Sequence, residues 1–117
     1  MKKLCDVKDI SFSYNKGYKK EMKILSEISF SIKQNEIVGI LGKNGCGKST
    51  LLNIISGFLV PQQGSVYINE KKINEYSINE RAKVVSYIQQ KNFTIPSYYE
   101  VQDFILEGRR PYRRFGV

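Results

Sequence analysis

Alternating apolar and polar residues predict two strands in the first third of the chain. Residues 10–14 (Ile-Ser-Phe-Ser-Tyr) and 28–32 (Ile-Ser-Phe-Ser-Ile) both alternate with a period of two, as strands with one buried face do. The polar segment between them, residues 15–23, contains Gly17 and is predicted to be a loop. Because antiparallel sheets commonly keep one face in solvent, we expect these strands to pair antiparallel.

A different pattern follows in residues 37–41, which are a continuous apolar run (Ile-Val-Gly-Ile-Leu). Such a run predicts a strand buried on both faces, which is typical of a parallel sheet. The glycine-rich residues 42–47 come next, and apolar residues then recur at helical spacing up to Phe58. Gly57 and Pro61 mark the end of that helix. The predicted order is therefore buried strand, glycine loop and helix.

Two more strands are predicted further along. Val66 and Ile68 alternate with polar residues and predict a third half-buried strand. Residues 84–88 predict a second strand buried on both faces.

Two short helices are predicted from their ends. Ser77 and Glu80 have the spacing of a capping box, which begins a helix. Glu100 and Asp103 lie where the first turn of a second helix favours acidic residues, and Gly108 would end it.

Residues 42–49 match the phosphate-binding loop pattern G-x-x-x-x-G-K-[ST] without a mismatch. Glycines let the backbone turn tightly, so that successive N–H groups and the positive end of the following helix can face one anion. Lys48 would reach the β- and γ-phosphates, Ser49 would ligate Mg²⁺ through its hydroxyl, and Thr50 offers a hydroxyl near the α-phosphate. The loop residues predicted to bind a nucleotide are Gly42, Asn44, Gly45, Cys46, Gly47, Lys48, Ser49 and Thr50.

Tyr14 ends the first predicted strand and is a candidate for contact with the base. An aromatic face at that point could stack on adenine, and such stacking is worth about 1–3 kcal/mol in nucleic-acid complexes. The alternative is that Tyr14 is an ordinary aromatic residue of a strand.

Composition excludes several classes of protein. A chain that is 41% hydrophobic and 12% aromatic is not a disordered tail, and no apolar run approaches the eighteen residues of a membrane span. No secretory signal is visible, two cysteines give no disulfide framework, and the absence of histidine excludes histidine triads and most zinc sites.

The net charge of +8 is spread along the chain, with one tight cluster at Arg109, Arg110, Arg113 and Arg114. It indicates either a solvated basic surface or an anionic partner.

With these motifs in place, residues 4–112 resemble the N-terminal half of an ATP-binding cassette (ABC) transporter ATPase. The resemblance implies an α/β fold, in which a P-loop NTPase core with a partial RecA-like parallel sheet joins an antiparallel β-subdomain. It assigns residues 1–35 and 64–76 to the antiparallel subdomain and residues 36–60 and 77–90 to the nucleotide-binding core. Residues 91–117 would hold the glutamine loop and the start of a helical subdomain that is not complete.

The resemblance also implies roles for individual residues. Tyr14 takes the place of the adenine-stacking aromatic. Gln90 takes the place of the glutamine that touches Mg²⁺ and the attacking water, and Gln89 stands where the family commonly has proline. That departure leaves the choice between Gln89 and Gln90 open. ATP and Mg²⁺ are the expected cofactors.

Residues 108–112 (Gly-Arg-Arg-Pro-Tyr) resemble one branch of the family in particular, the importer ATPases that serve iron–siderophore, haem and cobalamin uptake. The resemblance implies membrane-spanning permease subunits that bind the glutamine-loop region and a second ATPase subunit in a head-to-tail dimer. It places the protein in the cytoplasm, peripheral on the inner face of the cell membrane.

The family's second half carries a Leu-Ser-Gly-Gly-Gln signature, an acidic strand with the catalytic glutamate and a switch histidine, and none of these is in the sequence. We therefore expect a truncated ATPase that binds MgATP but does not hydrolyse it alone. We also expect an open sheet edge that favours self-association.

Two other readings remain at this point. One is a different P-loop NTPase, a GTPase or a nucleotide kinase, but the single Asn-Lys pair, Asn15-Lys16, precedes the loop and lacks the aspartate that recognises guanine. The other is a basic module that binds nucleic acid through the arginine cluster, which leaves the glycine loop unexplained. No nucleic acid is therefore expected as a partner.

Overall fold

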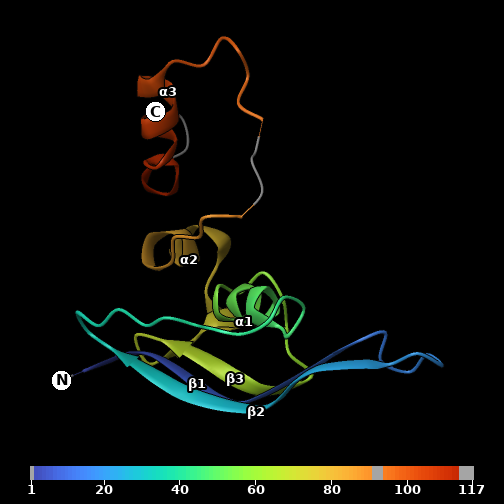
Figure 1. Cartoon of the computed structure of the whole chain (residues 1–117). Helices are drawn as coiled ribbons and strands as arrows, with labels where there is room; N and C mark the ends of the chain where they lie inside the picture. The colour runs from blue at the N-terminus through green and yellow to red at the C-terminus, as the bar shows by residue number, and fades with distance from the viewer. Residues whose placement is uncertain (1, 91–93, 114–117) are drawn as a thin grey trace. The chain divides into compact units, whose positions relative to one another are not determined.

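A computed structural model of the chain describes residues 2–90 and 94–113 (Figure 1). The chain forms two compact units, Met1–Tyr76 and Ser77–Val117, which are taken in turn. Arg114, part of the predicted arginine cluster, and part of the predicted glutamine-loop segment lie outside the described residues. Within the described ranges, no helix is both long and apolar enough to cross a membrane.

The first unit is built on an antiparallel sheet. Its strands are β1 (Lys3–Tyr14), β2 (Met22–Lys33), β3 (Gln63–Ile68) and β4 (Lys71–Lys72), in the order β2-β1-β3-β4. All three pairings are antiparallel. The strands predicted around residues 10–14, 28–32 and 66–68 are confirmed. The loop predicted over residues 15–23 is confirmed for residues 15–21, whereas Met22 and Lys23 already belong to β2.

Helix α1 (Lys48–Ile55) packs against one face of this sheet, as the ribbon shows (Figure 1). Ile54 of α1 and Ile10 of β1 are both fully buried. The core of the unit combines inward-facing residues of the strands with residues of α1 and of the 3₁₀ turn η1 (Ile73–Glu75). Its apolar members are Cys5, Val7, Ile10, Phe12, Leu25, Leu51, Ile54, Val66, Ile68 and Ile73.

A bulge in β1 keeps the apolar residues on the buried face. Strict alternation from Val7 would place Asp9 inward. Instead the register shifts between Val7 and Ile10, and Asp9 adopts a positive φ of 50°. The Asp9 N–H donates to Ser29 Oγ at 2.8 Å. The extra residue therefore turns Ile10 inward and leaves Asp9 exposed.

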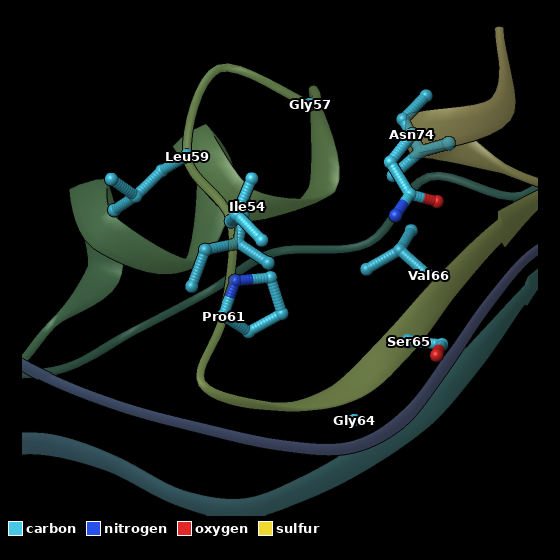
Figure 2. Close-up of a pocket in the computed structure, with 10 residues that line it drawn as sticks. Ile54, Gly57, Leu59, Pro61, Gly64, Ser65, Val66 and Asn74 are labelled. Carbon is cyan, nitrogen blue, oxygen red and sulfur yellow. The ribbon is translucent and has the colours of Figure 1, made fainter.

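The loop between α1 and β3 leaves a pocket of about 190 Å³ in the first unit. Figure 2 shows Pro61 on the stretch of chain that leads from α1 to β3 and Gly64 near the start of β3, with Ile54 of α1 and Val66 of β3 at the pocket. Its lining is mostly apolar and includes the fully buried Ile54.

The second unit contains α2 (Ile78–Val84), α3 (Val101–Glu107) and the 3₁₀ turn η2 (Arg110–Tyr112). Both helices begin with a reciprocal cap. The Glu80 N–H donates to Ser77 Oγ at 3.2 Å while the Ser77 N–H donates to Glu80 Oε2 at 2.9 Å. At α3 the Glu100 N–H donates to Asp103 Oδ2 at 3.0 Å. Both helices predicted from their first turns are thus confirmed.

The strand predictions for residues 37–41 and 84–88 are wrong. Residues 36–43 and 85–89 form neither helix nor strand, and Val84 is the last residue of α2. Ile37 is 99% exposed, Leu41 is 96% exposed and Ile88 is 90% exposed. A strand needs hydrogen bonds from a neighbouring strand, and no other segment within the described residues pairs with either run. The assignment of residue ranges to subdomains stays a prediction.

Candidate nucleotide-binding site

The predicted phosphate loop leads directly into α1. Gly47 is the residue before the helix, with φ at 107°, and Lys48 is its first residue. The first helical hydrogen bond runs from the Leu51 N–H to the Gly47 carbonyl at 2.9 Å. The N–H groups of Lys48, Ser49 and Thr50 therefore have no acceptor within the helix.

The loop closes on itself before the helix starts. The Cys46 N–H donates to the Lys43 carbonyl at 3.2 Å, which makes a tight turn around Asn44 and Gly45. An added Cβ on Gly42 would lie 2.6 Å from Cys46 Sγ, so the two ends of the turn are in contact. Residues 42–47 are thus brought together in one turn, whereas Lys48, Ser49 and Thr50 lie in the first turn of α1.

Gly47 lies where the turn packs closely against strand β2. A Cβ at this position would lie 2.6 Å from Ile24 Cγ2 and 3.0 Å from Leu25 Cδ2, both in β2. Its positive φ is also a conformation that other residues rarely adopt. The second glycine of the motif therefore lets the loop approach β2 while its backbone turns into α1.

Lys48 folds back over the loop. Its Nζ donates to the Gly42 carbonyl and, at 3.0 Å, to the Lys43 carbonyl. The ammonium group is therefore held at the start of the loop, although Lys48 itself lies in the first turn of α1. Lys43, whose own carbonyl accepts this bond, is exposed.

The charge at the start of α1 differs from that of the other two helices. α2 and α3 each carry an acidic residue in the first turn, Glu80 and Asp103, whereas α1 has none. A carboxylate there would neutralise the positive end of the helix. Its absence, together with the Lys48 ammonium, makes this helix start electropositive and suited to an anion.

Tyr14 lies next to this helix start. Its hydroxyl is hydrogen-bonded to Thr50 Oγ1 at 3.0 Å, and its ring meets the Phe12 ring edge-on, with centroids 4.9 Å apart. Tyr14 is 41% exposed, whereas Thr50 is 7% exposed. The sequence predicts both residues near a nucleotide but not their contact, because no local pattern indicates a bond between residues 36 positions apart.

The candidate metal contacts belong to both units. Ser49 is exposed in the first turn of α1, and a hydroxyl oxygen suits a hard cation such as Mg²⁺. Gln89 and Gln90 are exposed residues of the second unit. The contact of Ser49 and Gln90 with Mg²⁺, and the choice between the two glutamines, stay predictions.

Comparison with known proteins identifies the family. A family model described as ABC transporter matches residues 25–112. An uncharacterised ABC transporter ATP-binding protein of Methanocaldococcus jannaschii is 37% identical over 114 residues, which are 97% of this chain and 42% of that protein. A putative ABC transporter ATP-binding protein of Vibrio vulnificus is 35% identical over 107 residues, which are 92% of this chain and 18% of that protein. The chain thus spans less than half the length of these relatives.

Solved structures agree with this result. The cbiO1 protein of Clostridium perfringens, part of the ABC transporter complex cbiONQ, is 32% identical with a TM-score of 0.59, over 72% of this chain and 32% of that one. An ATP-binding cassette solved as a dimer with ADP and phosphate is 35% identical with a TM-score of 0.58, over 68% of this chain and 34% of that one. These likenesses confirm the α/β P-loop fold class and do not favour a GTPase, a nucleotide kinase or a nucleic-acid module. The chain belongs to the ATP-binding proteins of ABC transporters.

Proposed function

We propose that this chain binds MgATP, with the triphosphate in the turn formed by residues 42–47 and at the start of α1. The observation that carries the proposal is the Lys48 ammonium held over the loop carbonyls, at a helix start that has no acidic residue. Free N–H groups, the helix dipole and a lysine together favour a polyanion at one point. Ser49 would supply a hydroxyl to Mg²⁺, which neutralises the phosphates further.

The Tyr14 ring is proposed to stack on the adenine. Its hydroxyl bond to Thr50 and its contact with Phe12 support this role, because they hold an exposed ring beside the start of α1. A ring that is already fixed loses little conformational freedom when a base packs against it.

Transport is the wider role that we propose for the longer protein. There, ATP hydrolysis would drive uptake of a solute, with Gln90 touching Mg²⁺ and the attacking water. Residues 108–112 support an iron–siderophore, haem or cobalamin-like solute by their resemblance to that branch of importers. The protein would lie on the cytoplasmic face of the membrane, with permease subunits at the glutamine-loop region and a second ATPase subunit head-to-tail. The transporter complex named for cbiO1 and the dimeric cassette support these partners.

Isothermal titration of the 117-residue chain with MgATP tests the proposal. We expect one nucleotide per chain and, in the same samples, phosphate release at the background rate, because the chain lacks the acidic strand with its catalytic glutamate. MgGTP is expected to bind no more tightly than MgATP, since stacking on Tyr14 tolerates either base. Absence of heat with folded protein would contradict the proposal. A strong preference for GTP would favour a GTPase, and turnover that Lys48→Ala abolishes would contradict the expected lack of hydrolysis.

The two cysteines provide a second test without mutation. Cys46 is exposed in the loop, whereas Cys5 is 6% exposed in β1, and burial, followed by the nearby Asp6 carboxylate, raises the pKa of the Cys5 thiol to about 11. A bulky maleimide at pH 7.5 should therefore modify Cys46 and leave Cys5 unmodified, because the thiolate is the reactive form. Saturating MgATP should slow the labelling of Cys46, measured by peptide mass spectrometry. Equal labelling of Cys46 with and without MgATP would count against a nucleotide in this loop.

A further inference from the structure

The side chain of Gln62 is bonded to the backbone of the residue that precedes Tyr14. The Ser13 N–H donates to Gln62 Oε1 at 2.7 Å, and Gln62 Nε2 donates to the Ser13 carbonyl at 2.8 Å. One side-chain amide therefore satisfies both the N–H and the carbonyl of Ser13. Both bonds have good geometry for their type.

These two bonds lie where the strand pairing ends. The pairing of β1 with β3 stops at Ser11 opposite Gln63. Ser13 is the next residue of β1 with its N–H and carbonyl on the same side as those of Ser11. Because the glutamine amide has the donor and acceptor of a peptide group, Gln62 extends the pairing by one step without a strand.

The backbone next to Tyr14 is held in part by these two bonds from Gln62. On the other edge, β2 pairs Ser13 with Lys23 and Tyr14 with Met22. With Gln62 in place, Ser13 is held from both sides, one residue before Tyr14. Without it, Ser13 as well as Tyr14 would be held by β2 alone, at the edge of a hairpin whose loop is exposed.

Besides its pairing with Met22 of β2, Tyr14 has two links to the segment around α1. Its hydroxyl is bonded to Thr50 in the first turn of α1, and the residue before it is bonded to Gln62, which follows the loop after α1. Two links from one segment constrain both the position and the tilt of the ring. The orientation of an aromatic ring decides how well a base stacks on it.

We propose that Gln62 is a positioning residue for the Tyr14 ring, and through it for the base of the bound nucleotide. This inference rests on the proposed binding of MgATP. The side-chain hydrogen bonds of Gln62 both go to Ser13 and none goes to the phosphate loop, so its effect should be confined to ligands that carry a base.

The test compares two ligands, MgATP and magnesium tripolyphosphate, in isothermal titrations of the whole chain. Gln62→Met removes both hydrogen bonds and keeps the length of the side chain. Gln63→Met is the matched control, because Gln63 is the adjacent exposed residue and neither Ser13 bond involves it. We expect Gln62→Met to weaken MgATP binding at least about fivefold, as a poorly placed base loses much of its stacking. Tripolyphosphate binding should stay within about twofold of the unaltered chain, and Gln63→Met should change neither.

Two further readouts separate positioning from a general loss of structure. The Ser13 amide should exchange with deuterium faster in Gln62→Met, whereas amides of α1 should not. In a Tyr14→Ala background, Gln62→Met should cause no additional loss of MgATP affinity, because the ring through which it acts is gone.

Three results would overturn the inference. Unchanged MgATP affinity in Gln62→Met would show that the ring keeps its place without these bonds. Equal losses for MgATP and tripolyphosphate would show that Gln62 acts through the fold and not through the ring. Failure of the unaltered chain to bind MgATP would overturn the proposed function itself, and this inference with it.

Discussion

Replacing Lys48 with alanine is expected to weaken MgATP binding by about 100-fold. The ammonium is held at the phosphate loop by the carbonyls of Gly42 and Lys43, so it is already close to where the phosphates would lie. A hydrogen bond to a charged group contributes about 1.5–3 kcal/mol, and about 2.8 kcal/mol corresponds to a factor of about 100 in affinity. Isothermal titration with MgATP measures the loss directly.

Lys43→Ala is the control for this result. It removes the same charge from the same loop, but the side chain is exposed and the bond from Lys48 uses only the Lys43 carbonyl, which alanine retains. We expect it to change the affinity by no more than about threefold, since screened surface charges contribute little. Similar losses in the two variants would mean that general charge, and not the position of Lys48, retains the nucleotide.

Replacing Gly64 with alanine is expected to lower the free energy of unfolding of the first unit by about 3 kcal/mol or more. Gly64 has φ at 88°, and an added Cβ would lie 2.4 Å from the carbonyl oxygens of Lys8 and Asp9. The left-handed conformation costs about 1–2 kcal/mol in other residues, and overpacking against atoms that cannot move adds about 1–3 kcal/mol. These carbonyls belong to the backbone of β1, next to where Lys8 pairs with Ser65, so relief would require separating β1 from β3.

Gly17→Ala isolates the part of this effect that comes from the backbone alone. Gly17 has nearly the same φ, 86°, but an added Cβ would have no atom within 4 Å. We expect it to cost about 1–2 kcal/mol, measured for both variants by urea denaturation followed by circular dichroism. If Gly17→Ala proves as destabilising as Gly64→Ala, the close approach of β3 to β1 is not what requires glycine at residue 64.

Local patterns predicted the elements that depend on neighbouring residues. The alternation of residues 10–14 was enough to predict β1, because a strand with one buried face repeats every two residues. The Ser77–Glu80 and Glu100–Asp103 pairs predicted the starts of α2 and α3, because a capping box satisfies N–H groups within four residues. The loop motif placed the start of α1 near Lys48, because the motif is itself a short run of consecutive residues that leads into a helix.

Apolar runs predicted strands less well, since an apolar run indicates a preference for burial but does not show which strand it would pair with. Residues 37–41 are as apolar as a central strand, yet Ile37 and Leu41 are almost fully exposed. A strand buried on both faces needs neighbouring strands to pair with, and within the described residues this run has no such neighbour. The strand prediction therefore failed because the sequence of one segment does not show whether a pairing strand is present.

The sequence by itself determined the half-buried strands, the helix starts and the glycine turn with its lysine, because each depends on a few consecutive residues. Only the tertiary structure decided that the Tyr14 hydroxyl meets Thr50, that the Gln62 amide extends β1, and that Gly64 lies against the backbone of β1. These contacts join residues that are 36 to 56 positions apart. Such contacts depend on how the sheet and α1 pack together, and no local pattern of residues records that packing.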